Sequence, residues 1–171
     1  MIKKYLVIIS ISLLFSSNIY SAENSAAETS VYKKGKDDLT HLIGKNSNYK
    51  RGVDAFKQAK KYDKKKKKEK SQKRYEDAIK FFVLANKEQP NDPNILNYLG
   101  FSYRKVGDVM MAEIYYTQGL EIDPKHIGIN EYLGQLYVET NRIDKAKERL
   151  KILDNCNCDE FEKLNNLISK Y

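Results

Sequence analysis

The feature that most constrains this chain is a repeat of 34 residues in its second half. The positions that recur at this spacing are Ala78, Ala112 and Ala146, then Tyr75, Val109 and Ile143, then Phe82, Tyr116 and Leu150, and finally Pro90 and Pro124. A unit of this length cannot bury its own apolar face, so neighbouring units must stack on one another to form a continuous core.

The residues inside one unit predict two helices. Asp92 can cap a helix and Pro93 can start one. Apolar residues then recur at helical spacing on one face, and Gly107 with the following aspartate breaks the chain. A second helix is expected over residues 109–122, because Pro124 disfavours helical geometry in the residue before it.

These patterns resemble the tetratricopeptide repeat. Small residues, aromatics and the terminal proline fall at the family's positions in two successive units, residues 93–126 and 127–155, and a degenerate unit over 48–92 precedes them. The resemblance implies an all-α solenoid of about two to three helix-turn-helix repeats. Residues 156–171 are expected to hold a Cys-x-Cys loop and a capping helix.

Two glycines occupy small-residue positions of the first helices. Gly100 and Gly134 each cost their helix about 1 kcal/mol relative to alanine. They therefore indicate points where two helices approach each other closely.

The degenerate unit departs from this spacing. The small residue lies 12 positions before the alanine in the two good units, as Gly100 and Ala112 show, and this offset from Ala78 falls on Lys66. An amphipathic stretch lies earlier, over residues 49–62. We expect the first helix to be displaced by an insertion of about seven to eleven residues.

Residues 1–22 have the layout of a secretory signal peptide. Two lysines precede an apolar run over residues 5–15, which is shorter than the roughly 20 residues that span a bilayer. We expect export, to the periplasm of a Gram-negative cell or otherwise as a secreted protein, with cleavage near Ala22. Tyr20 occupies a position that favours a small residue, so an uncleaved anchor is the alternative. Residues 23–47 are expected to be a flexible lead-in.

By the resemblance, a stripe on the first helices lines a concave groove in which extended peptides or helices bind. Its members are Asn94, Asn97, Phe101, Arg104, Lys105, Glu131, Gln135 and Val138. We expect Phe101 to be an exposed aromatic off the packing face, whereas a merely solvated stripe is the alternative. The basic clamp that some family members use for a C-terminal carboxylate is not reproduced, because Asn97 and Glu131 occupy its positions. The predicted function is a protein-interaction module for an unidentified protein or peptide.

Positive charge is concentrated before the repeats. Residues 33–74 hold 17 Lys or Arg against five Asp or Glu, and residues 75–171 hold 12 against 16. The centre of this charge is a run of five: Lys64, Lys65, Lys66, Lys67 and Lys68. Such a run can hold a polyanion, but it lacks the arginine forks and interleaved aromatics that nucleic acid favours.

An A/T-rich codon bias explains these lysines as well, since Lys, Asn, Ile and Tyr are all abundant. We favour a solvated helix connection at the lysine run. Envelope-associated binding of a polyanion through the run, by membrane-surface contact above nucleic acid, is the alternative function.

Cys156 and Cys158 would lie in an oxidising compartment after export, which predicts a local disulfide. A redox pair is less favoured because its usual spacing is Cys-x-x-Cys. Zinc needs two further ligands, and the only histidines are His41 and His126. Phosphate-loop and paired-histidine motifs are absent from the sequence, so we expect a non-enzyme without cofactor or metal. The sequence does not determine the oligomeric state.

Overall fold

The computed structural model describes residues 47–171, so the predicted signal peptide and all but the last residue of the predicted lead-in lie outside it. This part of the chain contains helices and no strand. The helices are α2 (Asn48–Lys64), α3 (Lys68–Glu88), α4 (Pro93–Val106), α5 (Val109–Ile122), α6 (Ile127–Glu139), α7 (Ile143–Leu153) and α8 (Asp159–Ile168). None of them is long and apolar enough to cross a membrane.

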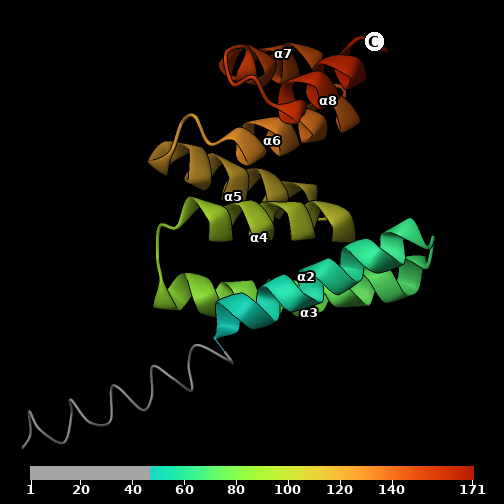
Figure 1. Cartoon of the computed structure of the whole chain (residues 1–171), viewed down its shortest axis with the longest axis vertical. Coiled ribbons are helices and arrows are strands. Elements are labelled where there is room, and N and C mark those ends of the chain that lie inside the picture. The colour runs from blue at the N-terminus through green and yellow to red at the C-terminus, as the bar shows by residue number, and fades with distance from the viewer. Residues whose placement is uncertain (1–46) are drawn as a thin grey trace, which may run out of the picture. The chain divides into compact units, whose positions relative to one another are not determined.

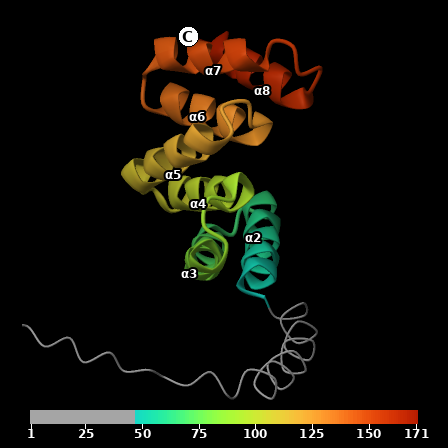
Figure 2. The ribbon, with the colours of Figure 1, turned by 90° about the vertical axis from the view of Figure 1, so that its left-hand side faces the viewer.

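Consecutive helices pack in pairs, α2 with α3, α4 with α5 and α6 with α7, and α8 packs on α6 and α7. Figure 1 shows the pairs stacked one upon the next, and Figure 2 shows the same order from the side. The described residues therefore form an all-α solenoid of helix-turn-helix repeats. The predicted fold class is confirmed.

The ends of α4 and α5 follow from local chemistry. The Asp92 carboxylate accepts a hydrogen bond from the Asn94 backbone N–H at 2.8 Å, with Pro93 in the first turn. Gly107 ends the helix in the left-handed region, at φ 91°. Asp108 then caps α5 by accepting from the Met111 N–H at 3.0 Å. The predicted bounds of α5 are confirmed.

Close helix approach at glycine is also confirmed. A Cβ on Gly100 would lie 2.5 Å from the ring of Tyr116, and one on Gly52 would lie 2.7 Å from the ring of Phe82. Gly52 is therefore the first pair's counterpart of Gly100. It lies 26 positions before Ala78 rather than 12, so the insertion is 14 residues long. The predicted length of about seven to eleven was too short.

The insertion extends two helices instead of forming a loop. The first pair has six extra residues at the end of α2, one in the turn and seven at the start of α3, relative to the second pair. Only residues 65–67 separate α2 from α3. The five lysines of the run are exposed, and their role as no more than a solvated connection stays a prediction. Lys64 to Lys68, called the lysine tip below, form the end of a helical hairpin.

The last pair is closed by α8, as predicted. Leu164 and Ile168 on one side of α8 are buried. The close approach of Gly134 is to Leu164 of this capping helix, and not to its own pair partner α7.

Candidate functional site

The first helices of the three pairs, α2, α4 and α6, contact each other in sequence, α2 with α4 and α4 with α6. All eight residues predicted to line a groove lie on α4 or α6. We call the surface formed by α2, α4 and α6 the first-helix face. The structure brings the predicted residues to this face but buries several of them.

Phe101 corrects the sequence interpretation most strongly. Phe101 is only 7% exposed. Its ring centroid lies 5.0 Å from that of Phe56 on α2 and 4.8 Å from that of Tyr132 on α6, both in edge-on geometry. Phe101 is a core residue that joins three first helices, and the expected exposed apolar patch is wrong. The pattern of α4 alone did not reveal that α2 and α6 cover this side of it.

Three further predicted groove residues are buried. Glu131 is 2% exposed and Val138 is 3% exposed, and the side chain of Arg104 is 7% exposed. The remaining predicted residues keep access to solvent: Asn94 and Lys105 are exposed, and Asn97 and Gln135 are partly exposed.

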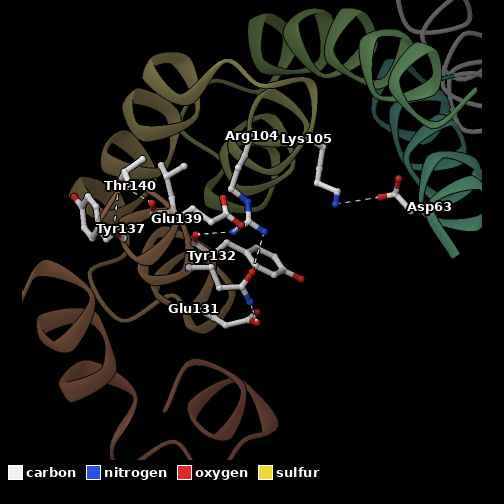
Figure 3. A network of polar contacts seen from close by, with 10 residues as sticks. Asp63, Arg104, Lys105, Glu131, Tyr132, Tyr137, Glu139 and Thr140 are labelled. Atoms are coloured by element: carbon white, nitrogen blue, oxygen red, sulfur yellow. Dashed lines mark hydrogen bonds and ion pairs between the residues drawn. The ribbon is translucent and has the colours of Figure 1, made fainter. Parts of the chain in front are cut away.

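Arg104 forms the polar link between α4 and α6 (Figure 3). Its Nη2 donates to Gln135 Oε1 at 2.9 Å, and its Nη1 donates to the Tyr132 carbonyl at 3.4 Å. The same Nη1 lies 3.5 Å from Glu139 Oε1. The guanidinium also lies 5.4 Å from the centroid of the Phe101 ring. Arg104 therefore fixes the register of two repeats, and its charge is not free to meet a ligand.

Asp63 is the corresponding link between α2, α3 and α4, and Figure 3 shows its ion pair with Lys105 of α4. Lys105 Nζ lies 3.2 Å from Asp63 Oδ2, the Tyr75 hydroxyl donates to the same oxygen at 2.9 Å, and the Ser71 hydroxyl donates to Oδ1. Burial by itself would raise the pKa of Asp63, but these hydrogen bonds and the Lys105 charge outweigh it and lower the pKa. Burial, and then the Asp63 carboxylate, raise the pKa of Tyr75, which keeps its hydroxyl a neutral donor.

Glu131 is a carboxylate with the opposite shift. Burial raises its pKa, and Glu160 adds to this effect. The charges of Lys163 and Arg104 and the hydrogen bond from Gln135 Nε2 at 2.5 Å oppose it. The first-helix face therefore holds one carboxylate that is stabilised as an anion and one that is not.

The lysine tip is exposed and has a defined backbone. The five lysines form no ion pair with any residue of the described part of the chain. The Lys67 N–H donates to the Tyr62 carbonyl at 3.0 Å and the Lys66 N–H to the Asp63 carbonyl at 2.8 Å. This is the Schellman pattern of a helix C-terminus, with Lys66 in the left-handed region at φ 54°.

The Sγ atoms of Cys156 and Cys158 are placed at bonding distance, immediately before α8. The disulfide between them stays a prediction. In residues 47–171 no cluster of three or more His, Cys, Asp or Glu side chains is arranged to hold a metal ion.

Sequence reasoning missed several residues of the face. Lys60 Nζ lies 5.7 Å above the Phe101 ring and Asp63 joins three helices, yet neither belongs to the repeat pattern. Tyr132 carried a signal, because it repeats Tyr98 at the 34-residue spacing. No sequence signal pointed to Asp63, because its partner on α4, Lys105, lies 42 positions away.

Comparisons with known proteins agree with this architecture. Residues 94–126 match the family model described as tetratricopeptide repeat. The chain is also 33% identical over 54 residues to a protein of Pyropia yezoensis called "Uncharacterized protein ycf37". That match covers 32% of this chain and 30% of the relative, so the chain spans less than a third of the relative's length.

Solved structures place the described helices in the class of tetratricopeptide-like solenoids. The first such domain of Spaghetti (RPAP3), bound to an HSP90 peptide, is 16% identical, with a TM-score of 0.54 over 71% of this chain and 93% of that one. The Sgt2 domain from Aspergillus fumigatus is 17% identical, with a TM-score of 0.53 over 70% and 77%. The Yersinia enterocolitica chaperone SycD, bound to a peptide of the translocator YopD, is 20% identical, with a TM-score of 0.51 over 69% and 86%. Residues 94–126 thus match the tetratricopeptide repeat model, within a solenoid of the same fold as these structures.

Proposed function

We propose that this chain is a non-enzymatic interaction module that binds an extended peptide or a helix of a partner protein on its first-helix face. The observation that carries the proposal is that accessible polar side chains lie on all three helices of that face. Lys60 lies on α2, Asn94 and Lys105 on α4, and Gln135 on α6. A ligand that follows the face would meet all three repeats.

The layer beneath these side chains supports the same proposal. Phe56, Phe101 and Tyr132 pack edge to edge under them, and Arg104 and Asp63 tie the helices together. A rigid scaffold lowers the cost of ordering the protein when a ligand binds. The RPAP3 and SycD structures show peptides bound by other proteins of this fold.

Export belongs to the proposal as well. Its support is the pattern of residues 1–22, a charged start followed by a short apolar run and small residues. The expected compartment is the periplasm of a Gram-negative cell. Fractionation of expressing cells, with amino-terminal sequencing of the recovered protein, tests both export and the cleavage near Ala22.

Selection from a random peptide library against the full chain tests the binding face. We expect selected peptides to lose at least about tenfold in affinity for Lys60→Glu, because the reversed charge stands on the face beside the Phe101 ring. Lys147→Glu is the matched control, because Lys147 is an exposed residue of α7 and lies outside the first-helix face. The affinity of the peptides for this control variant should stay within about twofold of their affinity for the unmodified protein. Equal losses in both variants would contradict the proposed face.

A further inference from the structure

The lysine tip lies at the far end of α2, beyond the part of the first-helix face that α4 contributes. It lies at the end of the hairpin that the 14-residue insertion creates, and Figure 1 shows the turn between α2 and α3 lying beyond the end of α4. At 1.5 Å per residue, α3 with 21 residues is about 10 Å longer than α5 with 14. The lysines are therefore carried away from the repeat core on a helical support.

Nothing in the described part of the chain neutralises the tip. Of the two acids that flank the tip, Asp63 is engaged by Lys105 and by two hydroxyl groups. Glu69 forms no ion pair with a described residue. Lys68 and Lys70 occupy the first turn of α3, where the helix dipole favours negative charge. The positive charge at the tip is thus concentrated, exposed and uncompensated.

Lys66 argues against codon bias as the whole explanation. The other left-handed residues of the described chain are Gly107, Asn91, Asn141 and Asn157. Asparagine tolerates this conformation better than lysine does. Its codons are as rich in A and T as those of lysine, so base composition does not choose between the two. A lysine occupies this position against the local conformational preference, and such conflicts concentrate at functional positions.

We propose that the lysine tip docks the protein on an anionic phospholipid surface. Lysine ammonium groups are flexible point charges that need no fixed phosphate geometry, and clustered lysines on a helical element are attracted to the potential of anionic lipids. Large apolar side chains that could insert into the bilayer are not exposed at the tip. The contact is therefore peripheral and weakens as salt is added.

Nucleic acid fits the tip less well. Lys64 to Lys68 contain no arginine for bidentate phosphate contacts. The flanking aromatics are Tyr62, which is half-buried, and Tyr75, which is 1% exposed, so neither offers a free ring for base stacking. Binding to an anionic lipid surface requires only positive charge, which the tip supplies.

Vesicle sedimentation of the full chain tests the proposal. The probes are vesicles of phosphatidylglycerol and phosphatidylcholine in a ratio of about 3:7, and vesicles of phosphatidylcholine alone, at about 0.1 M salt. The tip variant replaces Lys64 to Lys68 by glutamine, which has a helix propensity comparable to that of lysine. The control variant replaces five exposed lysines elsewhere: Lys87, Lys125, Lys147, Lys151 and Lys170. Both variants lose the same net charge and keep the same amino-terminal segment.

We expect the unmodified chain to bind the anionic vesicles at least about tenfold more tightly than the neutral ones. The tip variant should lose at least about tenfold in this binding, while the control variant stays within about threefold. The tip variant should still bind the peptides selected on the first-helix face, so the two proposals fail separately. Equal losses in both variants would overturn the proposal, since net charge alone would then explain binding. Duplex DNA that displaces the protein from vesicles at equal phosphate concentration would reassign the tip to nucleic acid.

Discussion

The first pair and the last pair use the same glycine position to solve different packing problems. In the first pair Gly52 of α2 faces the ring of Phe82 on α3, its own partner. In the last pair Gly134 of α6 faces Leu164 of α8, a helix outside the pair. The repeat therefore determines that this position must hold a small side chain. Which helix packs against that position depends on its place in the solenoid.

The two regions also differ in where their length goes. The helices α2 and α3 have 17 and 21 residues, and α6 and α7 have 13 and 11. Between Ala59 on α2 and Ser71 on α3 the first pair has no buried residue, so the outer part of its added length carries charge and not core. The last pair has no such extension and depends on α8 to cover its apolar end.

The largest expected effect concerns the side chain that joins the first pair to the rest. Phe101→Ala should lower the free energy of unfolding by about 3 to 5 kcal/mol, because it empties a buried site between Phe56 and Tyr132. Urea unfolding followed by circular dichroism measures it. Met110→Ala, at a residue that is 71% exposed, should change stability by less than about 0.5 kcal/mol. Similar small effects in both would restore the interpretation of Phe101 as an exposed groove residue.

Leucine at the two glycines sharpens the comparison itself. Gly52→Leu should cost about 3 kcal/mol, because the fully buried ring of Phe82 cannot move aside. Gly134→Leu should cost nearer 1 kcal/mol, because the obstructing atoms are the ends of the Leu164 side chain on a terminal helix. The same urea experiment applies, with Gln118→Leu on the exposed side of α5 as control. The reverse order would mean that α8 is held more rigidly than α3.

Glu131→Gln tests the buried carboxylate of the last pair. Burial raises the pKa of Glu131 in the folded state, so the folded protein binds this proton more tightly than the unfolded chain. Stability from this group is present below the unfolded pKa and is lost as the pH rises through the folded pKa. Thermal melts across this pH range should show the Gln variant gaining on the unmodified protein as the pH rises. Glu162→Gln, at an exposed residue of α8, should show no such gain.

The cysteine pair should contribute less than the packing changes. A ring of three residues stabilises by at most ~1.6 kcal/mol through chain entropy. The double variant with serine at 156 and 158 should therefore stay folded and melt slightly earlier. Protein isolated without reductant should show no free thiol when it is denatured and alkylated. Reactive thiols in that protein would refute the disulfide.

The smallest expected effect is a gain in stability at the tip. Lys66→Asn should stabilise the protein by up to about 1 kcal/mol, because asparagine adopts the left-handed conformation more readily. Lys65→Asn is the control, since Lys65 has φ −89° and gains nothing from the change. Thermal unfolding compares the two variants. A gain for Lys65→Asn of the same size would show that relief of charge repulsion, and not conformation, is responsible.

The repeat spacing predicted the helices and their order because both depend on local chemistry. Asp92 with Pro93, Gly107 with Asp108 and the proline at 124 act within a few residues of themselves, and their helices begin and end where expected. The lysine insertion was harder to place. A run of lysines is compatible with both a helix and a solvated loop. The close approach of Gly52 to Phe82, which lies further along the chain, shows how the insertion is divided between the two helices.

For the described residues, the sequence by itself determined an all-helical solenoid of stacked pairs, because a 34-residue period with small residues at fixed positions buries its apolar face only by stacking. Only the tertiary structure decided which residues of the predicted groove stripe stay accessible to solvent. Phe101, Arg104 and Glu131 lie on the stripe that the sequence assigned to a ligand, yet α2, α6 and α8 cover them. The periodicity of one helix shows which residues share a side. The neighbours that cover that side come from residues tens of positions away, which no local pattern contains.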